Sequence, residues 1–229
     1  MIKVTPILLA ILYALAMYRF SAWRTAKELN ARSTELADPA LKGLMDRLAV
    51  SLDLPRIRVH IYEILPVNGL AAPDGRIFIT RGFYNKFRAG EVSAEEIASV
   101  IAHELGHVAL GHSRRRMIDF SGQNALRTAL AMTIGRFIPG VGVWIANMLT
   151  TMLAAHLSRG DEYEADAYAA ALLTKAGIGI NPQISLFRKL EKLTQSNAGA
   201  APAWLLSHPK TEDRIAALSA LQQKWLRDS

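Results

Sequence analysis

A run of apolar residues over 97–110 predicts a helix that is buried on nearly every side. Its only polar side chains are Ser99, two histidines and one glutamate. Ser93 stands three residues before Glu96, which is the capping-box pattern of a helix start. Gly111 offers a C-terminal stop. Because the apolar run and the capping residues agree, this helix is the best-defined element of the sequence.

A second helix is predicted from Asp161 to about Ala176. Projected at about 100° per residue, its apolar side chains form one stripe: Ala165, Ala169, Leu172, Leu173 and Ala176. Glu162 and Asp166 fall inside or at the edge of this stripe, one turn apart, whereas Glu164 points to the opposite side. We expect Asp161 and Glu164 to be solvated and to favour the helix N-terminus electrostatically.

Alternating apolar and polar residues over 57–64 predict a strand, and a turn at 73–75 leads into a second strand at 76–80. We expect these two strands to form a small antiparallel sheet. An amphipathic helix is predicted over 34–52, with a proline in its first turns, and a final helix is predicted from about Thr211. The expected fold class is therefore α+β, mostly helical with a small sheet.

Composition and charge narrow the possible functions. The chain has 229 residues, of which 51% are hydrophobic and 21% charged, and no cysteine, which excludes disulfides, thiolate zinc sites and thiol catalysis. Its net charge is +7, with basic residues gathered in 19–32 and 114–116. These basic residues either face anionic lipid head groups or are simply solvated. Nucleic-acid binding is not expected, because no aromatic interleaving or known binding motif accompanies the charge.

Metal chemistry is indicated by residues 103–107, which read His-Glu-Leu-Gly-His inside the buried helix. His103 and His107 differ by about 40° around the helix, so both imidazoles leave the same face one turn apart. Two neutral imidazoles at that spacing can hold one Zn²⁺, while Glu104 can take a proton from water on the metal. Without a metal, the helix would bury two imidazoles and a carboxylate without evident partners, at a cost of several kcal/mol. The alternative is that these side chains cap neighbouring backbone groups in an ordinary core helix.

A third protein ligand is needed for catalytic zinc. A metzincin would have glycine at 110 and histidine at 113, where this chain has Leu110 and Ser113. His112 falls about 140° around the helix from His107 and beyond its glycine stop, so it is not the expected ligand. We predict Glu162 as the third ligand and Asp166 as an acceptor that orients a ligand imidazole. The alternative for Glu162 is an ordinary acid in the first turn of a helix.

The chain resembles the membrane-associated gluzincin metallopeptidases, the family that includes the CAAX prenyl protease and the heat-shock protease HtpX. Four segments carry the resemblance: residues 68–80, 103–107, 158–166, and 207–209 with 214–215. It implies a gluzincin-type fold and one Zn²⁺ per chain on His103, His107 and Glu162, with Glu104 as the base. It also implies that Arg214 helps to position the ligand residues without binding the metal itself. Gly69-Leu70 departs from the family pattern of an alanine and an aromatic residue at the wall of the cleft.

His208 is the only histidine beyond the predicted Glu162 helix. It is either a loop residue before the final helix or a second donor to the oxyanion, which gluzincins often supply from a distant loop. A histidine that reaches the oxyanion can also reach the metal when substrate is absent. We therefore expect His208 to act as a latch on the metal at rest and as a donor during turnover.

The termini and the middle of the chain complete the predicted organisation. Residues 4–18 are apolar except for Thr5, and residues 1–20 as a whole are just long enough to cross a bilayer. Arg19 and Arg24 follow the apolar run directly, which favours a retained anchor over a cleaved signal. Positive-inside bias favours a single pass with domain 21–229 in the cytoplasm, the periplasm being the alternative. We expect a helical insertion at about 120–157 that packs over the cleft, either as a lid or as a core helix.

The predicted function is zinc-dependent endopeptidase, acting on protein or peptide substrates at or near a membrane in protein quality control. An extended substrate would pair with the edge of the strand at 76–80; the alternative is a core hairpin without contact to substrate. A zinc-stabilised scaffold or chaperone-like factor is the rival interpretation, although a purely structural zinc has no use for Glu104. A basic module that binds membrane surfaces is the third interpretation. The sequence leaves the natural substrate and the oligomeric state open.

Overall fold

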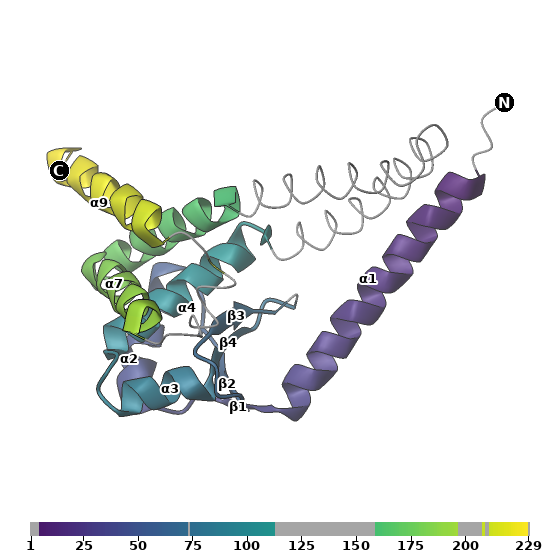
Figure 1. Cartoon of the computed structure of the whole chain (residues 1–229), viewed down its shortest axis with the longest axis horizontal. Coiled ribbons are helices and arrows are strands. Elements are labelled where there is room, and N and C mark those ends of the chain that lie inside the picture. The colour runs from purple at the N-terminus through teal and green to yellow at the C-terminus, as the bar shows by residue number, and fades with distance from the viewer. Residues whose placement is uncertain (1–4, 73, 113–158, 197–207, 209–210, 229) are drawn as a thin grey trace.

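The computed structural model describes residues 5–72, 74–112, 159–196, 208 and 211–228. Within these ranges the chain is mostly helical, with one small sheet, as the α+β expectation requires. Figure 1 shows the helix α1 (Thr5–Ala31) running out from the sheet, away from the remaining helices. The expected insertion at 120–157 lies outside the described residues.

The sheet has four strands in the order β1-β2-β4-β3. The strands are β1 (Ser33–Glu35), β2 (Val59–Tyr62), β3 (Gly69–Ala71) and β4 (Ile77–Thr80). β2 pairs with β4 in parallel, and the outer strands β1 and β3 pair antiparallel to their neighbours. The prediction of an antiparallel sheet is therefore wrong, and the sheet is mixed.

The strands β2 and β4 run parallel because another strand, β3, lies between them along the chain, and the sequence pattern does not reveal it. β3 has only three residues, too few for a visible alternation, and it lies at the outer edge of the sheet. A tight turn with Gly75 at a φ of 85° sends the chain back from β3 into β4. This hairpin places β4 between β3 and β2, where it runs in the same direction as β2.

The predicted helix at 34–52 begins later than expected. α2 spans Pro39–Ser51, with Asp38 as its N-cap accepting hydrogen bonds from two backbone N–H groups. Proline suits the first helical position because its ring fixes φ and its missing N–H has no intrahelical partner there. Residues 34 and 35 belong instead to β1, so this part of the prediction is wrong.

α4 (Ala94–Ala109) is the central helix, and it has the predicted ends. The side chain of Ser93 accepts from the Glu96 N–H and the Glu96 carboxylate accepts from the Ser93 N–H, which completes the capping box. Gly111 adopts a φ of 70° just beyond the helix. α4 packs against β3 and β4 on one side and against α2 and α7 (Asn181–Ser196) on others.

Three other helices complete the described structure. α3 (Arg81–Arg88) directly follows the strand β4. A helix at 159–175, which has no label in Figure 1, begins the part of the chain described after residue 112. α9 spans Thr211–Asp228, so its predicted start is confirmed. The core contains fully buried side chains from α4 and from the 159–175 helix, among them Ile97, Ile101 and Leu173. Burying such aliphatic side chains stabilises the fold by about 1.5–3 kcal/mol each.

Searched over the described residues, the chain contains no helix long and apolar enough to cross a membrane.

Candidate metal centre

His103 and His107 leave the same face of α4, as their spacing predicts. These two residues are 1% and 3% exposed. The two Nε2 atoms lie 3.1 Å apart and the rings meet edge to face. A buried helix thus directs two imidazole nitrogens at one point.

The helix at 159–175 supplies a carboxylate to that point. Glu162 is 2% exposed, and its oxygens lie 3.4 Å from His103 Nε2 and 3.5 Å from His107 Nε2. Gly106 allows the close packing of the two helices, since a Cβ there would lie 3.0 Å from the Ala165 carbonyl oxygen. A larger residue at 106 would push the helix that carries Glu162 away from the histidines.

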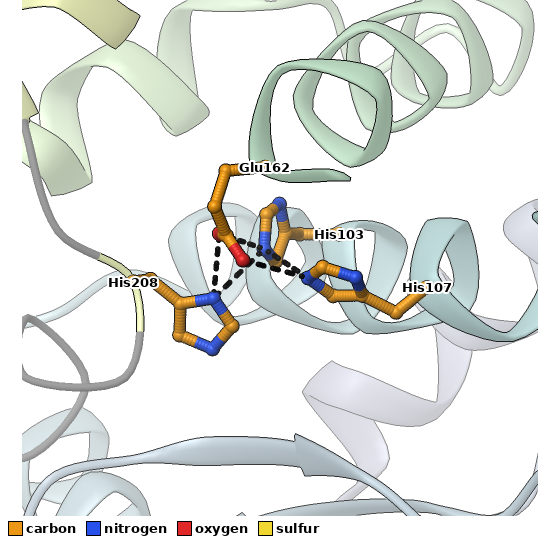
Figure 2. A group of neighbouring side chains, drawn as sticks. All are labelled: His103, His107, Glu162 and His208. Atoms are coloured by element: carbon orange, nitrogen blue, oxygen red, sulfur yellow. Dashed lines mark hydrogen bonds and ion pairs between the residues drawn. The ribbon is translucent and has the colours of Figure 1, made fainter. Parts of the chain in front are cut away.

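A fourth side chain reaches the same point from the segment before α9. His208 is 5% exposed, and its Nδ1 lies 2.6 Å from Glu162 Oε2 and 3.5 Å from His103 Nε2. Figure 2 shows the four side chains of His103, His107, Glu162 and His208 converging from two helices and a loop. The structure therefore brings together all three predicted ligands and the predicted latch.

The cluster has the dimensions of a zinc site. Its four possible ligand atoms, one from each of the converging residues, lie within 4.8 Å of one another. Zinc–nitrogen bonds of 2.0–2.1 Å in a tetrahedron separate neighbouring ligand atoms by about 3.3 Å. Most of the separations between the nitrogen and oxygen atoms given above fall near this value. Three imidazoles and one carboxylate are also the ligand types that Zn²⁺ prefers, so the residues fit the metal.

Asp166 lies behind His103, where it was predicted. Its Oδ1 is 2.9 Å from His103 Nδ1, on the side of the ring opposite the cluster. Arg214 holds this carboxylate with Nε and Nη2 at 2.6 and 2.7 Å, and it also donates to the His208 carbonyl oxygen at 3.2 Å. Gln183 donates to Asp166 at 3.2 Å. Asp166 and Arg214 thus link His103 to His208: Asp166 contacts His103, and Arg214 binds both Asp166 and the His208 carbonyl oxygen.

The charges of these groups favour a cation in the cluster. Burial alone would lower the pKa of His103, yet the carboxylates of Asp166 and Glu162 raise it to about 9. Burial would raise the pKa of Glu162, but contacts with His103 and His208 hold it far below its usual range. Burial likewise opposes ionisation of Asp166, and the Arg214 guanidinium holds its pKa below the usual value. Both carboxylates are therefore ionised at neutral pH.

Glu104 lies beside the cluster and is not one of its four converging residues. Its side chain is 2% exposed, and Oε1 has no hydrogen-bond partner among the described residues. His208 Nε2 lies 3.6 Å from this oxygen. Gly69 of β3 packs closely here, since a Cβ at this position would lie 3.4 Å from Glu104 Oε1 and 2.6 Å from Val100 Cγ1. A buried carboxylate oxygen thus remains available to a proton donor beside the metal centre.

Of the two acidic residues expected to be solvated, one needs correction. Asp161 was expected to be solvated but is 6% exposed. Glu164 does keep an exposed side chain, at 58%, yet it lies 3.2 Å from His112 Nε2. His112 is fully buried and its Nδ1 lies 2.9 Å from His107 Nδ1. The sequence argument placed His112 outside the site, because it did not foresee how the chain turns at Gly111.

Comparisons with known proteins identify the family of this chain. Residues 35–222 match the model of peptidase family M48. Metalloprotease LoiP of Escherichia coli is 31% identical over 174 residues, which cover 76% of this chain and 66% of LoiP. Metalloprotease YcaL of the same organism is 29% identical over 158 residues, which cover 69% of this chain and 59% of YcaL. The chain therefore spans less than two thirds of the length of these two relatives.

The predicted family resemblance is confirmed by a further relative. A protease HtpX homologue of Chlorobium phaeovibrioides is 25% identical over 234 residues, which cover 86% of this chain and 77% of that protein. The family match spans the strands β2, β3 and β4, the helix α4, the helix at 159–175 and most of α9. Every residue of the metal centre lies inside it. The chain belongs to peptidase family M48.

Proposed function

We propose that this protein is a zinc-dependent endopeptidase that cleaves protein substrates at or near a membrane, in protein quality control. The observation that carries the proposal is the buried cluster of three histidines and one glutamate, with an available carboxylate beside it. Membership of peptidase family M48 and the metalloprotease names of the relatives support it.

One zinc ion per chain would be held by His103, His107 and Glu162. Asp166 accepts the Nδ1–H of His103, so the Nε2 lone pair of that ring faces the cluster. When bound, zinc acts as a Lewis acid that polarises a carbonyl group and lowers the pKa of water. Glu162 also supplies a negative charge that offsets part of the charge of the ion.

Glu104 is the proposed general base. It takes a proton from the attacking water and returns it to the leaving amine, and one carboxylate can do both in sequence. Gly69 keeps β3 close to this carboxylate because no side chain stands between them. Burial excludes bulk water from Glu104 and strengthens its interactions with charge that develops in the site.

His208 has two proposed roles. At rest its Nδ1 is turned toward Glu162 and the cluster, where it can act as a fourth ligand and hold the enzyme off. During turnover it would donate to the oxyanion of the tetrahedral intermediate, which forms as water adds to the peptide carbonyl. Arg214 would hold the backbone of His208 in place in both roles, through its hydrogen bond to the His208 carbonyl oxygen.

An extended substrate would add to the edge of the sheet. The sequence suggested the strand at 76–80, but β4 is flanked by β2 and β3, so the outer strand next to α4 is β3. Pairing with β3 uses backbone hydrogen bonds, which makes recognition tolerant of side-chain sequence. Such tolerance suits an enzyme that cleaves many unfolded proteins.

Membrane attachment would come from residues 1–20. Part of α1 exposes large apolar side chains, namely Leu12, Tyr13, Leu15 and Phe20, each more than half accessible. Arg19 lies near the end of this segment, Arg24 and Lys27 follow on the same helix, and all three suit anionic head groups. On the positive-inside rule the metal centre would face the cytoplasm.

The activity can be tested on the full chain in detergent. Casein cleavage should stop when a zinc chelator is added and return when zinc is restored, because the proposed ligands hold a removable ion. Magnesium should not restore cleavage, since it prefers oxygen ligands. Cleavage that is indifferent to the chelator would overturn the proposal, as would the absence of cleavage with zinc fully loaded.

A further inference from the structure

His112 forms a second polar contact behind the metal centre, on the side of His107 that faces away from the cluster. Its Nδ1 lies 2.9 Å from His107 Nδ1. Its Nε2 lies 3.2 Å from Glu164 Oε2 and 3.7 Å from Asp161 Oδ1. The ring is fully buried, so these contacts are shielded from water.

The protons in this chain of contacts have one consistent arrangement when a metal is bound. His107 must leave Nε2 unprotonated to bind metal, so its neutral ring carries the proton on Nδ1. That N–H can then donate to His112 Nδ1, which must be unprotonated to accept it. His112 accordingly carries its own proton on Nε2, where the carboxylates of Glu164 and Asp161 accept it.

Gly111 brings His112 into this place. On a continued straight helix, His112 would lie about 140° around the axis from His107. Gly111 adopts a φ of 70°, which ends α4 and turns His112 back over its last turn. A Cβ at Gly111 would contact nothing within 4 Å, so only the backbone conformation favours glycine there.

We propose that His112 is a positioning residue that holds the His107 ring in the tautomer and orientation needed to bind zinc. The proposal rests on the zinc site put forward above and extends it to His107. The two ligand histidines are then oriented differently, His103 by the carboxylate of Asp166 and His107 by a neutral imidazole. Groups that orient ligand histidines contribute about 10-fold to 100-fold in metal affinity.

The test is the zinc dissociation constant of the full chain, measured by competition with a chromophoric chelator. His112→Leu should weaken zinc binding about 10-fold to 100-fold, because it removes the acceptor for the His107 proton. His112→Asn should keep most of the affinity, since its amide oxygen can take the place of Nδ1. His112→Gln places its amide further out, near the position of Nε2, and should not restore binding.

If His112→Leu does not fold, two glycine variants can still test the role of His112. Gly111→Ala and Gly90→Ala replace glycines with φ of 70° and 73° and open space around the position of Cβ, so their backbone costs match. Both should lower the melting temperature of the metal-free protein by a similar amount. Only Gly111→Ala should weaken zinc binding, because Gly90 precedes the start of α4 and lies at the opposite end of that helix from His107 and Gly111.

The electronic spectrum of the Co²⁺-substituted protein gives a readout that packing alone does not change. His112→Leu should alter the visible absorption bands, and His112→Asn should preserve them. Equal zinc affinity in wild type, His112→Leu and Gly111→Ala would overturn the role of His112, as would equal losses in the leucine and asparagine variants. A wild-type chain that binds no zinc would overturn the proposed function itself, so the two failures are distinguishable.

Discussion

Around His103, individual charges are placed so that the ring presents a lone pair to the cluster. Asp166 is held ionised by Arg214 and lies against His103 Nδ1, so the proton that the ring keeps when its Nε2 binds a metal stays on that side. Removing Arg214 would leave a buried carboxylate with fewer donors, at a cost of about 1–3 kcal/mol or more. The proposed zinc site therefore depends on a residue that is not one of its proposed ligands.

His208 provides a prediction at this scale. Changing His208 to alanine should weaken zinc binding and alter turnover by about tenfold or more. Turnover rises if the resting contact with Glu162 dominates and falls if donation to the oxyanion dominates. Steady-state kinetics on a peptide substrate, together with zinc titration, provide the measurement. Unchanged kinetics with unchanged zinc affinity would make His208 an ordinary loop residue.

Single residues of the site were predictable to different degrees. His103, Glu104 and His107 follow from spacing on one helix, and Glu162 follows from a carboxylate on an apolar stripe. His112 was missed because its position depends on one left-handed glycine, Gly111, which periodicity does not describe. A histidine directly after a helix-ending glycine is the signal that could have found it.

At the scale of elements, the close approach of α4 and the helix at 159–175 sets the geometry of the metal centre. Gly106 is the contact point, and the backbone of Ala165 lies against it. The same packing buries Glu162 opposite the two histidines. Two helices far apart in the sequence are thus held together where each supplies part of one ligand set.

Gly106→Val tests this packing. Overfilling a tight helix contact costs about 1–3 kcal/mol and should move Glu162 away from the histidines, which weakens zinc binding. Gly43→Val is the matched control, because Gly43 lies within α2 and a Cβ there would meet nothing within 4 Å. Melting temperature and zinc stoichiometry should both drop for Gly106→Val, and the control should keep its zinc. Full zinc retention by both variants would contradict this account of the packing.

The elements themselves were predictable wherever a long pattern existed. α4 has its predicted caps, and α9 begins at the predicted residue. The mixed sheet was not predictable, because β1 and β3 have only three residues each and strand order depends on contacts distant in sequence. The start of α2 was misplaced since residues 34 and 35 pair with β2, and tertiary pairing overrode the local helical pattern.

For the whole molecule, the arrangement of α1 bears on where the enzyme would work. α1 runs out from the sheet, and its last turns are tied to the domain by a 2.6 Å hydrogen bond from Tyr62 to Glu28. Arg76 also donates to Asn30 at 2.7 Å. These contacts fix the end of α1 next to the sheet, so an anchor in residues 1–20 would hold the metal centre near the bilayer.

Membrane fractionation tests this arrangement. The full chain should remain with membranes after a high-salt wash, and a variant lacking residues 1–20 should be released as an active protein. A second variant with Arg19, Arg24 and Lys27 changed to glutamine should also resist the wash, because apolar insertion rather than charge provides the attachment. A full chain that washes off, or a truncated variant that still needs detergent, would contradict the predicted anchor.

The most direct test of the proposed metal centre compares bound zinc and casein turnover in Glu104→Gln and Glu162→Ala. Glu104→Gln should keep about one zinc per chain and lose turnover by orders of magnitude, because it removes the base but no ligand. Glu162→Ala should lose most of its zinc and its turnover together. Near-normal proteolysis by Glu104→Gln, or full zinc retention by Glu162→Ala, would contradict the assignment of these residues.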